Sequence, residues 1–366
     1  MSFLKDRQYF VNANGINSDI ETLNIGVPQG STLGPLLFLI YINDMPSMST
    51  VLSYILFADD TTALYSSPSI DYLFQTVNTE ITKLNTWFAA NKLLVNATKT
   101  NFVLFMNQQK EKHISLLSSH KVCMNHTEIK QKDSVKFLGL LLDKNINFKS
   151  HVDFICTKLS KSLFALRRAA NVLQQNDLKT LYSALFLPYL NYGILIWGGI
   201  CKRDNQYSVL DHGETINPMG HLSKIHVLQK RAIRVISKSN RVAHHIPLLY
   251  HLEILDLHDL YSVKALSFFY DYFYGNLPPI LSNIITFYYS RNNQLFIKTQ
   301  YRRTNVAACS IIHTLPVIWN PLPAEIKSYI SKSKRTFLTH VKAFFISKYF
   351  EWKCEALDCG SCSRIS

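Results

Sequence analysis

The stretch "YILFADDTTALY", residues 54–65, places two adjacent carboxylates, Asp59 and Asp60, inside an otherwise apolar sequence. One apolar run leads up to the pair and a second run leaves it, which predicts two strands joined in a β-hairpin with the acids at its tip. Aspartate suits the positive φ of a tight turn less well than glycine, so turn formation alone does not explain the pair. A divalent cation does explain it, because Mg²⁺ prefers one or two protein carboxylates together with substrate phosphates. The alternative is a merely solvated turn.

Two segments on either side of the acidic pair carry groups that suit phosphate binding. Upstream, "GVPQGS" at 26–31 is a Gly/Pro loop that leads into a predicted helix, where free backbone N–H groups can face a phosphate or a base. Downstream, "LLVNATKTNFVLF" places Lys99 at the entrance of a predicted strand at 101–105, as a mobile cation. Ser31 or Thr32 is expected to cap the helix, whose predicted apolar face consists of Leu33, Leu36, Leu37, Ile40 and Tyr41.

The spacing of apolar residues predicts the fold class. Apolar residues at three-and-four spacing predict a long amphipathic helix at 70–90, and "VKFLGLLL" at 135–142 predicts a glycine-interrupted strand. A second helical stripe runs from Val152 to Leu173, with Lys161 and Arg168 on the opposite side. Helices dominate from there to about residue 270. We therefore expect an α+β protein, with a mostly antiparallel sheet and packed helices followed by a helical region.

Composition limits the class of protein and its partners. With 47% hydrophobic residues, the 366-residue chain can bury a sizeable core and is not a disordered tail. Lys and Arg outnumber Asp and Glu by 39 to 25, which suits a phosphate-bearing partner or an anionic membrane, although a merely soluble basic surface is the alternative. Seven scattered cysteines without a signal peptide indicate a reducing compartment, so we expect a nuclear or cytoplasmic protein that is not secreted.

Two further segments have a competing functional interpretation. The uncharged run at 181–200 contains Pro188 and Asn191, and it predicts a buried helical hairpin rather than a membrane span, so no stable membrane insertion is expected. Core packing is expected there instead of base stacking for Tyr182, Tyr189, Tyr192 and Trp197. Cys354, Cys359 and Cys362 are spaced like part of a zinc site, but without a clear fourth ligand they are more simply free thiols.

The order of these motifs resembles a known family. "GVPQGS" before "LGPLLFLIYIND", then "FADD", then N-x-x-KT, then "KFLG", is similar to the reverse transcriptases of non-LTR retrotransposons, most of all the jockey-type elements. The resemblance runs from about residue 3 to 240. It implies a right-hand polymerase, here an incomplete palm at 1–145, a helical thumb-like region at 146–245 and a C-terminal region of unknown role at 246–366. The implied partners are an RNA template, a DNA primer and dNTPs.

The resemblance also implies roles for individual residues. Asp59 would be the principal Mg²⁺ ligand with Asp60 beside it, two ions would occupy a complete site, and Mn²⁺ is a possible substitute. Lys99 would lie near the triphosphate as a candidate proton donor to pyrophosphate. Residues implied to contact the template base and the nucleotide are Gly26, Pro28, Gln29, Gly30 and Ser31, with Phe57 supporting the turn. The implied primer grip is Phe137, Leu138 and Gly139, and the implied contacts to the nucleic-acid backbone are Lys158, Lys161, Arg167 and Arg168.

One expected part of this family's site has no counterpart in the sequence. The palm uses a third carboxylate on an earlier strand, but the acids upstream of Gly26 are only Asp6, Asp19 and Glu21. We therefore expect a copy truncated at its N-terminus, with exposed apolar surface and a barrier to phosphoryl transfer raised by several kcal/mol. Three hypotheses remain: a crippled RNA-directed DNA polymerase, an inactive fragment that binds RNA or RNA/DNA hybrid, and a helical membrane-associated or scaffold protein.

Overall fold

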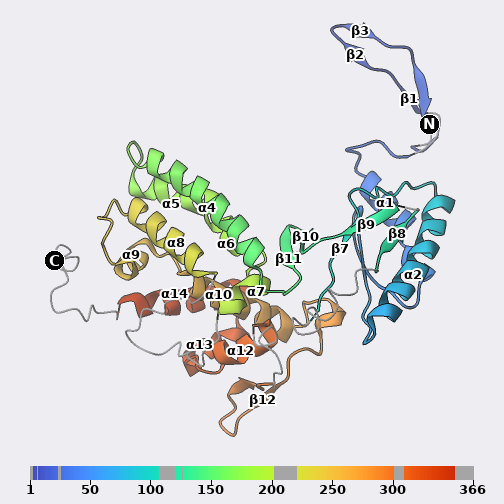
Figure 1. Ribbon diagram of the computed structural model, residues 1–366. Coiled ribbons are helices and arrows are strands. Elements are labelled where there is room, and N and C mark those ends of the chain that lie inside the picture. The colour runs from blue at the N-terminus through green and yellow to red at the C-terminus, as the bar shows by residue number, and fades with distance from the viewer. Residues whose placement is uncertain are drawn as a thin grey trace. The chain divides into compact units, whose positions relative to one another are not determined.

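The computed structural model describes residues 3–5, 7–23, 26–106, 120–125, 127–201, 221–300 and 309–350. The chain divides into two compact units, residues 1–132 and 133–366. Figure 1 shows short strands with α1 and α2 in the first unit and mainly helices in the second. The hairpin at 134–143 belongs to the second unit. The division predicted from the sequence, with a palm at 1–145, a thumb-like region at 146–245 and a C-terminal region at 246–366, stays a prediction. Cys354, Cys359 and Cys362 lie outside the described residues.

The first unit is built around one long helix and several small sheets. Its elements are β1 (Arg7–Tyr9), β2 (Asn12–Ala13), β3 (Ile16–Asn17), β4 (Glu21–Leu23), α1 (Gly34–Ile42), η1 (Met45–Met48), β5 (Ser53–Phe57), β6 (Asp60–Leu64), α2 (Ile70–Ala90), β7 (Asn101–Phe102), β8 (Val122–Met124) and β9 (Thr127–Gln131). The pairs β1–β4, β2–β3, β5–β6 and β8–β9 are antiparallel, and β7 pairs with β9 in parallel. Among the described residues these strands form separate sheets of two or three strands rather than one large sheet.

The helix predicted at 70–90 is confirmed as α2. Ser69 caps it by accepting a hydrogen bond from the backbone N–H of Tyr72. Its apolar stripe packs into two small cores, one with η1 and the other with β8 and β9. Glu80 is buried on this helix, and its carboxylate lies 2.6 Å from the ammonium of Lys83. Amphipathic spacing therefore located both the ends and the buried face of the helix.

The predicted apolar face of α1 is wrong. Leu36 is 54% exposed and Ile40 is 64% exposed, while Gly34 and Ile42 are the buried positions. Ile42 packs with Met45, Leu52, Leu84 and Trp87. The sequence of α1, GPLLFLIYI, is apolar on every side, so its periodicity could not indicate which face is buried.

The second unit is a helical domain with two small hairpins. Its elements are β10 (Ser134–Phe137), β11 (Leu140–Asp143), α4 (Lys149–Ala169), α5 (Gln175–Leu185), α6 (Leu187–Asn191), α7 (Ile194–Trp197), η2 (Gly198–Cys201), α8 (Ser223–Ile236), α9 (His245–Leu252), α10 (Leu257–Phe273), η3 (Pro279–Leu281), β12 (Phe287–Tyr289), β13 (Leu295–Ile297), α12 (Ile311–Trp319), α13 (Ala324–Ser328), η4 (Tyr329–Ser331) and α14 (Lys334–Phe350). One apolar core runs through it from Leu140 to Tyr349.

The segment at 181–200 is part of this core, as predicted. It contains the end of α5, all of α6 and α7 and the start of η2, and Trp197 is fully buried. None of the described helices has the length and apolarity that crossing a bilayer requires. For the exposed Tyr189 and Tyr192 the expectation of core packing is wrong, whereas Tyr182 and Trp197 confirm it.

Titratable groups gather where α8, α9, α10 and α14 meet. His226 Nδ1 lies 3.0 Å from Asp256 Oδ1, and the rings of His226 and His245 are 5.4 Å apart between centroids. The hydroxyl of Tyr349 donates to the carboxylate of Asp259. Burial, assisted by the charge of Asp256, raises the pKa of Asp259 to about 7. Burial, assisted by the charge of Lys230, lowers the pKa of His245 to about 3.

These two shifted groups are expected to have opposite effects on the pH dependence of stability. Asp259 binds its proton more tightly in the folded state, so its contribution is complete below pH 3.8 and is lost as pH rises through 7. His245 is held neutral, so its contribution is present above pH 6.5 and is lost as pH falls toward 3. Asp259→Asn should therefore make stability fall more steeply on acidification from pH 6.5 to 4.5, and His245→Gln should reverse that slope, each by on the order of 1–2 kcal/mol. Urea midpoints at each pH measure this, and parallel profiles for both variants would contradict it.

Candidate functional site

Asp59 and Asp60 lie at the tip of the β5–β6 hairpin, where the sequence places them. Phe57 pairs with Asp60 at the last register position, so Ala58 and Asp59 form a two-residue turn. Both carboxylates are exposed, so neither pays the desolvation cost of a buried charge. Ala58 adopts a left-handed backbone with φ of +51°, which costs a non-glycine residue about 1 kcal/mol. The hairpin therefore presents two adjacent carboxylates on a strained turn.

The carboxylates suit a hard cation in their chemistry. Mg²⁺ takes oxygen ligands and commonly binds through one or two carboxylates, with water or phosphate oxygens completing its shell. Within the part of the chain that the structure describes, no group of three or more His, Cys, Asp or Glu side chains is arranged to hold a metal. Asp59 and Asp60 thus fit the protein side of a phosphate-shared Mg²⁺ site, but not a closed site made by the protein alone.

The Gly/Pro loop before α1 owes its shape to two glycines. Gly26 and Gly30 have φ of +76° and +80°, and open space surrounds the position of a Cβ at each, so glycine is needed for the backbone angle and not for close packing. The backbone N–H of Ser31 donates to the carbonyl of Pro28 at 3.2 Å, which closes a tight turn. Arg7 Nη2 donates to the carbonyl of Gly26 at 2.6 Å.

Ser31 contacts the start of α1 in a different way from the one predicted. The N-cap position is Leu33, and no side chain caps it. The hydroxyl oxygen of Ser31 instead accepts a hydrogen bond from the backbone N–H of Gly34 at 3.2 Å. Gln29 and Gly30 are exposed at the turn, so this loop presents backbone and amide groups to solvent.

Lys99 lies two residues before β7, close to its predicted place at a strand entrance. Its backbone N–H donates to the carbonyl and the side-chain Oδ1 of Asn96, each at 3.1 Å. This Asx turn fixes the backbone while the ammonium group stays exposed. The strand itself is shorter than the predicted 101–105 and ends at Phe102. Lys99 is therefore a solvent-facing cation on a defined turn.

The "KFLG" segment is a hairpin rather than one glycine-interrupted strand. β10 and β11 pair antiparallel with Phe137 opposite Leu140, so Leu138 and Gly139 form the turn. Both turn residues have positive φ, +44° at Leu138 and +86° at Gly139. The glycine marked this turn in the sequence, but an apolar leucine before it favoured a continuous strand. The implied primer-grip residues therefore occupy the tip of a two-stranded ribbon.

The outer face of α4 carries the implied backbone contacts. The apolar stripe predicted from Val152 to Leu173 is buried as far as Leu166, but α4 ends at Ala169, so Leu173 lies beyond the helix. Lys161, Arg167 and Arg168 are exposed and Lys158 is partly exposed. Lys158 Nζ lies 5.4 Å from the ring centroid of the exposed Phe154, and the guanidinium of Arg168 lies 5.9 Å from that of Phe164. Neither phenylalanine was predicted from the sequence, although aromatic and basic residues four apart were a visible signal.

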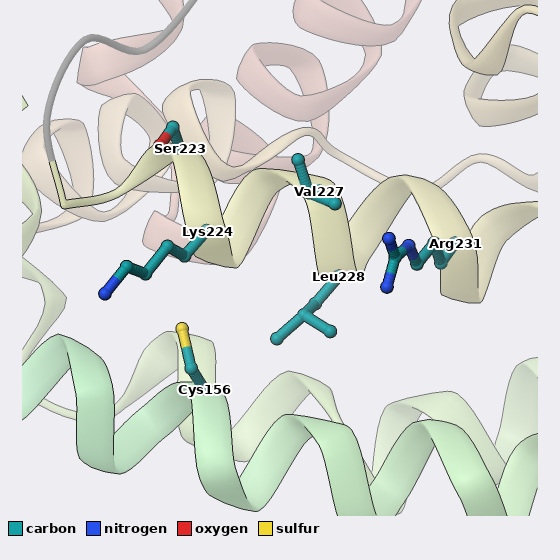
Figure 2. A pocket seen from close by; sticks show the side chains of 6 residues that line it. All are labelled: Cys156, Ser223, Lys224, Val227, Leu228 and Arg231. Atoms are coloured by element: carbon teal, nitrogen blue, oxygen red, sulfur yellow. The ribbon is translucent and has the colours of Figure 1, made fainter.

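An open pocket lies beside this helix, between α4 and α8 (Figure 2). Its volume is about 360 Å³, and its lining residues are Cys156, Ser223, Lys224, Val227, Leu228 and Arg231. Lys224 Nζ lies 2.6 Å from Asp153 Oδ1, so one lining cation joins the two helices. None of these residues was predicted from the sequence, because the pocket depends on the packing of helices that are far apart in the chain.

The structure thus distributes the expected site residues over two units. The first unit carries Asp59, Asp60, Phe57, Lys99 and the loop at 26–31. The second unit carries the Leu138–Gly139 turn and the cations of α4. Asp59, Asp60 and Lys99 are exposed, whereas Leu138, Gly139 and Lys158 are partly buried. Their roles stay predictions.

Comparisons with known proteins point to one family. Residues 2–142 match the family model described as reverse transcriptase (RNA-dependent DNA polymerase). The chain is 28% identical over 247 residues to the RNA-directed DNA polymerase from mobile element jockey of Drosophila melanogaster, which covers 64% of this chain and 24% of that protein. It is 27% identical over 244 residues to the probable RNA-directed DNA polymerase from transposon X-element of the same species, with the same shares covered. The chain spans about a quarter of the length of these curated relatives.

Proposed function

We propose, from the match of residues 2–142 to the reverse transcriptase family model, that the chain is part of an RNA-directed DNA polymerase of a non-LTR retrotransposon. The reaction would join a deoxynucleotide to the 3′ hydroxyl of a primer on an RNA template and release pyrophosphate. The observation that carries the proposal is the pair of exposed carboxylates at the β5–β6 tip, inside the matched segment.

The chemistry follows from groups on the first unit. Asp59 and Asp60 would hold Mg²⁺, which stabilises the attacking and leaving oxygens of such a transfer when it is bound. The loop at 26–31 would contact the template base and the nucleotide through its backbone and Gln29. Lys99 would deliver a proton from Nζ to the departing pyrophosphate. Mn²⁺ shares the preference for oxygen ligands and is proposed as a substitute for Mg²⁺.

We propose that these 366 residues supply only two of three metal-binding carboxylates. Asp19 and Glu21, the described acids before Gly26, lie at the exposed N-terminal hairpin. Two carboxylates hold the metals weakly and orient the primer hydroxyl poorly, which raises the barrier by several kcal/mol. Extension by this chain alone is therefore expected to be slow.

A second function is favoured by the outer face of α4. Exposed phenylalanines beside Lys158 and Arg168 form a surface that suits a nucleic acid, since cations attract phosphates and aromatic rings contact bases or sugars. On this alternative the chain binds RNA or RNA/DNA hybrid without catalysis.

Primer extension separates the two functions. A DNA primer on an RNA template is incubated with the chain, dNTPs and Mg²⁺, and with Ca²⁺ as the control ion. Slow extension that requires Mg²⁺ supports the polymerase. Hybrid binding that weakens with salt, without extension even in Mn²⁺, leaves the binding function, and absence of both contradicts the two proposals.

The α4 surface gives a separate prediction. The triple variant Lys158→Gln, Lys161→Gln and Arg168→Gln is expected to weaken hybrid binding and to reduce the slope of log K against log salt concentration by about 2 to 3, because each phosphate contact contributes nearly one unit. Fluorescence anisotropy at several salt concentrations measures it. The charge-matched control replaces Lys264, Lys298 and Lys332, which are exposed elsewhere in the second unit. Equal changes in both triple variants would show that only net charge matters.

A further inference from the structure

The turn at the tip of the β10–β11 hairpin is contacted by a tyrosine far along the chain. The hydroxyl of Tyr192 donates to the carbonyl oxygen of Leu138 at 2.5 Å, across 54 residues of sequence. A Cβ on Gly139 would lie 3.0 Å from Cε1 and 3.1 Å from the hydroxyl of the same side chain. Glycine at position 139 is therefore needed for two reasons: it adopts the positive φ of the turn, and it leaves room for the Tyr192 ring.

Tyr192 is itself fixed to the helical core. It follows α6 directly, and its carbonyl accepts a hydrogen bond from Trp197 Nε1 at 2.8 Å. The next residue, Gly193, has φ of +61°, and a Cβ there would lie 2.7 Å from Leu140 Cδ2. Trp197 and Leu140 are both buried. The turn between α6 and α7 thus packs against the hairpin through a ring, a hydrogen bond and a close backbone approach.

This contact uses a side chain that is otherwise largely in solvent. Tyr192 is 56% exposed, so burial of its ring contributes less than it does for the fully covered Trp197. A two-stranded ribbon has little stability of its own, and its tip is its most mobile part. A hydrogen bond to the tip therefore restricts the part of the ribbon that most needs support.

We propose that Tyr192 is a positioning residue that holds the Leu138–Gly139 turn in place for the 3′ end of the primer. The inference rests on the proposed function, in which this turn contacts the primer. Correct placement of a reacting end to within fractions of an ångström has large effects on rate, so the support of such a turn is part of the working site. Tyr192 acts through the hairpin and is not required to touch the reacting atoms.

Tyr192→Phe in the full chain tests this, because it removes the hydroxyl and keeps the ring. Hydrogen exchange of the peptide spanning 134–143 measures the mobility of the hairpin. Binding is measured with two RNA/DNA hybrids that carry 2-aminopurine, one with a recessed primer 3′ end and one with an uninterrupted DNA strand. The matched control is Tyr189→Phe, at an exposed tyrosine on α6 about one turn earlier.

We expect Tyr192→Phe to speed exchange in the hairpin about 2- to 10-fold, the range that corresponds to loss of one hydrogen bond. It should also weaken binding of the recessed primer end by a similar factor and leave the uninterrupted hybrid unchanged. Unchanged exchange overturns the proposal, and so does faster exchange with equal loss on both hybrids. If the wild-type chain binds both hybrids equally well, that result contradicts the proposed polymerase function and not the role of Tyr192. Hydrogen exchange of the hairpin alone then decides whether Tyr192 holds the turn.

Discussion

Asp59→Asn is expected to lower Mg²⁺-dependent primer extension at least about a thousandfold from the wild-type rate of the same chain, equivalent to roughly 4 kcal/mol in the barrier. Asparagine keeps the size of the side chain but removes the negative charge that holds a divalent cation. Because Asp59 is exposed on a two-residue turn, the substitution should leave the fold of the hairpin unchanged. Single-turnover extension with a saturating primer and template measures the effect.

Iron-mediated cleavage gives a second readout that does not depend on the wild-type rate. Fe²⁺ takes the place of Mg²⁺ at oxygen sites, and with ascorbate and peroxide it cuts the backbone near the bound metal. Cleavage is expected within the β5–β6 hairpin of the wild-type chain and should be lost in Asp59→Asn. Asp19→Asn, an equal charge change at another exposed position of the first unit, is the matched control. Cleavage that persists in Asp59→Asn would contradict a metal site at this tip.

Trp197→Ala is expected to destabilise the second unit by about 3–5 kcal/mol, the usual cost of removing a fully buried tryptophan. The indole is completely buried, packs edge-on against His151 with 5.8 Å between centroids, and donates to the carbonyl of Tyr192. Its removal leaves a cavity and an unpaired carbonyl. Urea unfolding followed by far-ultraviolet circular dichroism measures the loss, since helices dominate this unit.

The neighbouring Ile196 supplies the control for this prediction. It lies on the same short helix, α7, but is 52% exposed. Ile196→Ala should therefore cost less than about 1 kcal/mol. Similar losses in the two variants would mean that α7 as a whole, and not the indole, determines the stability of this region.

Periodicity predicted the long helices because their sequences are amphipathic. α2 and α4 alternate apolar and polar residues at helical spacing, so their positions and buried faces followed from the sequence. α1 is apolar on all sides, and the same method chose the wrong face. The spacing of apolar residues therefore located the helices. It identified the buried face of a helix only where polar residues marked the opposite face.

The candidate site was predictable where its signal is local. The acids at 59 and 60 lie between two apolar runs, which is enough to place them at a hairpin tip. The turn at Leu138 was missed because a leucine with positive φ has no sequence signature. The role of Tyr192 depends on a contact across 54 residues, which one sequence without coordinates does not reveal.

The long separation between Leu138 and its tyrosine partner also matters while the protein is being made. Leu138 is joined to the growing chain first, and the tyrosine that contacts its carbonyl is joined 54 residues later. At an ordinary translation rate of 5–20 residues per second, this interval lasts about 3 to 11 s. During that time the nascent ribbon lacks its anchor, so the hairpin reaches its final form only after synthesis has passed the turn between α6 and α7.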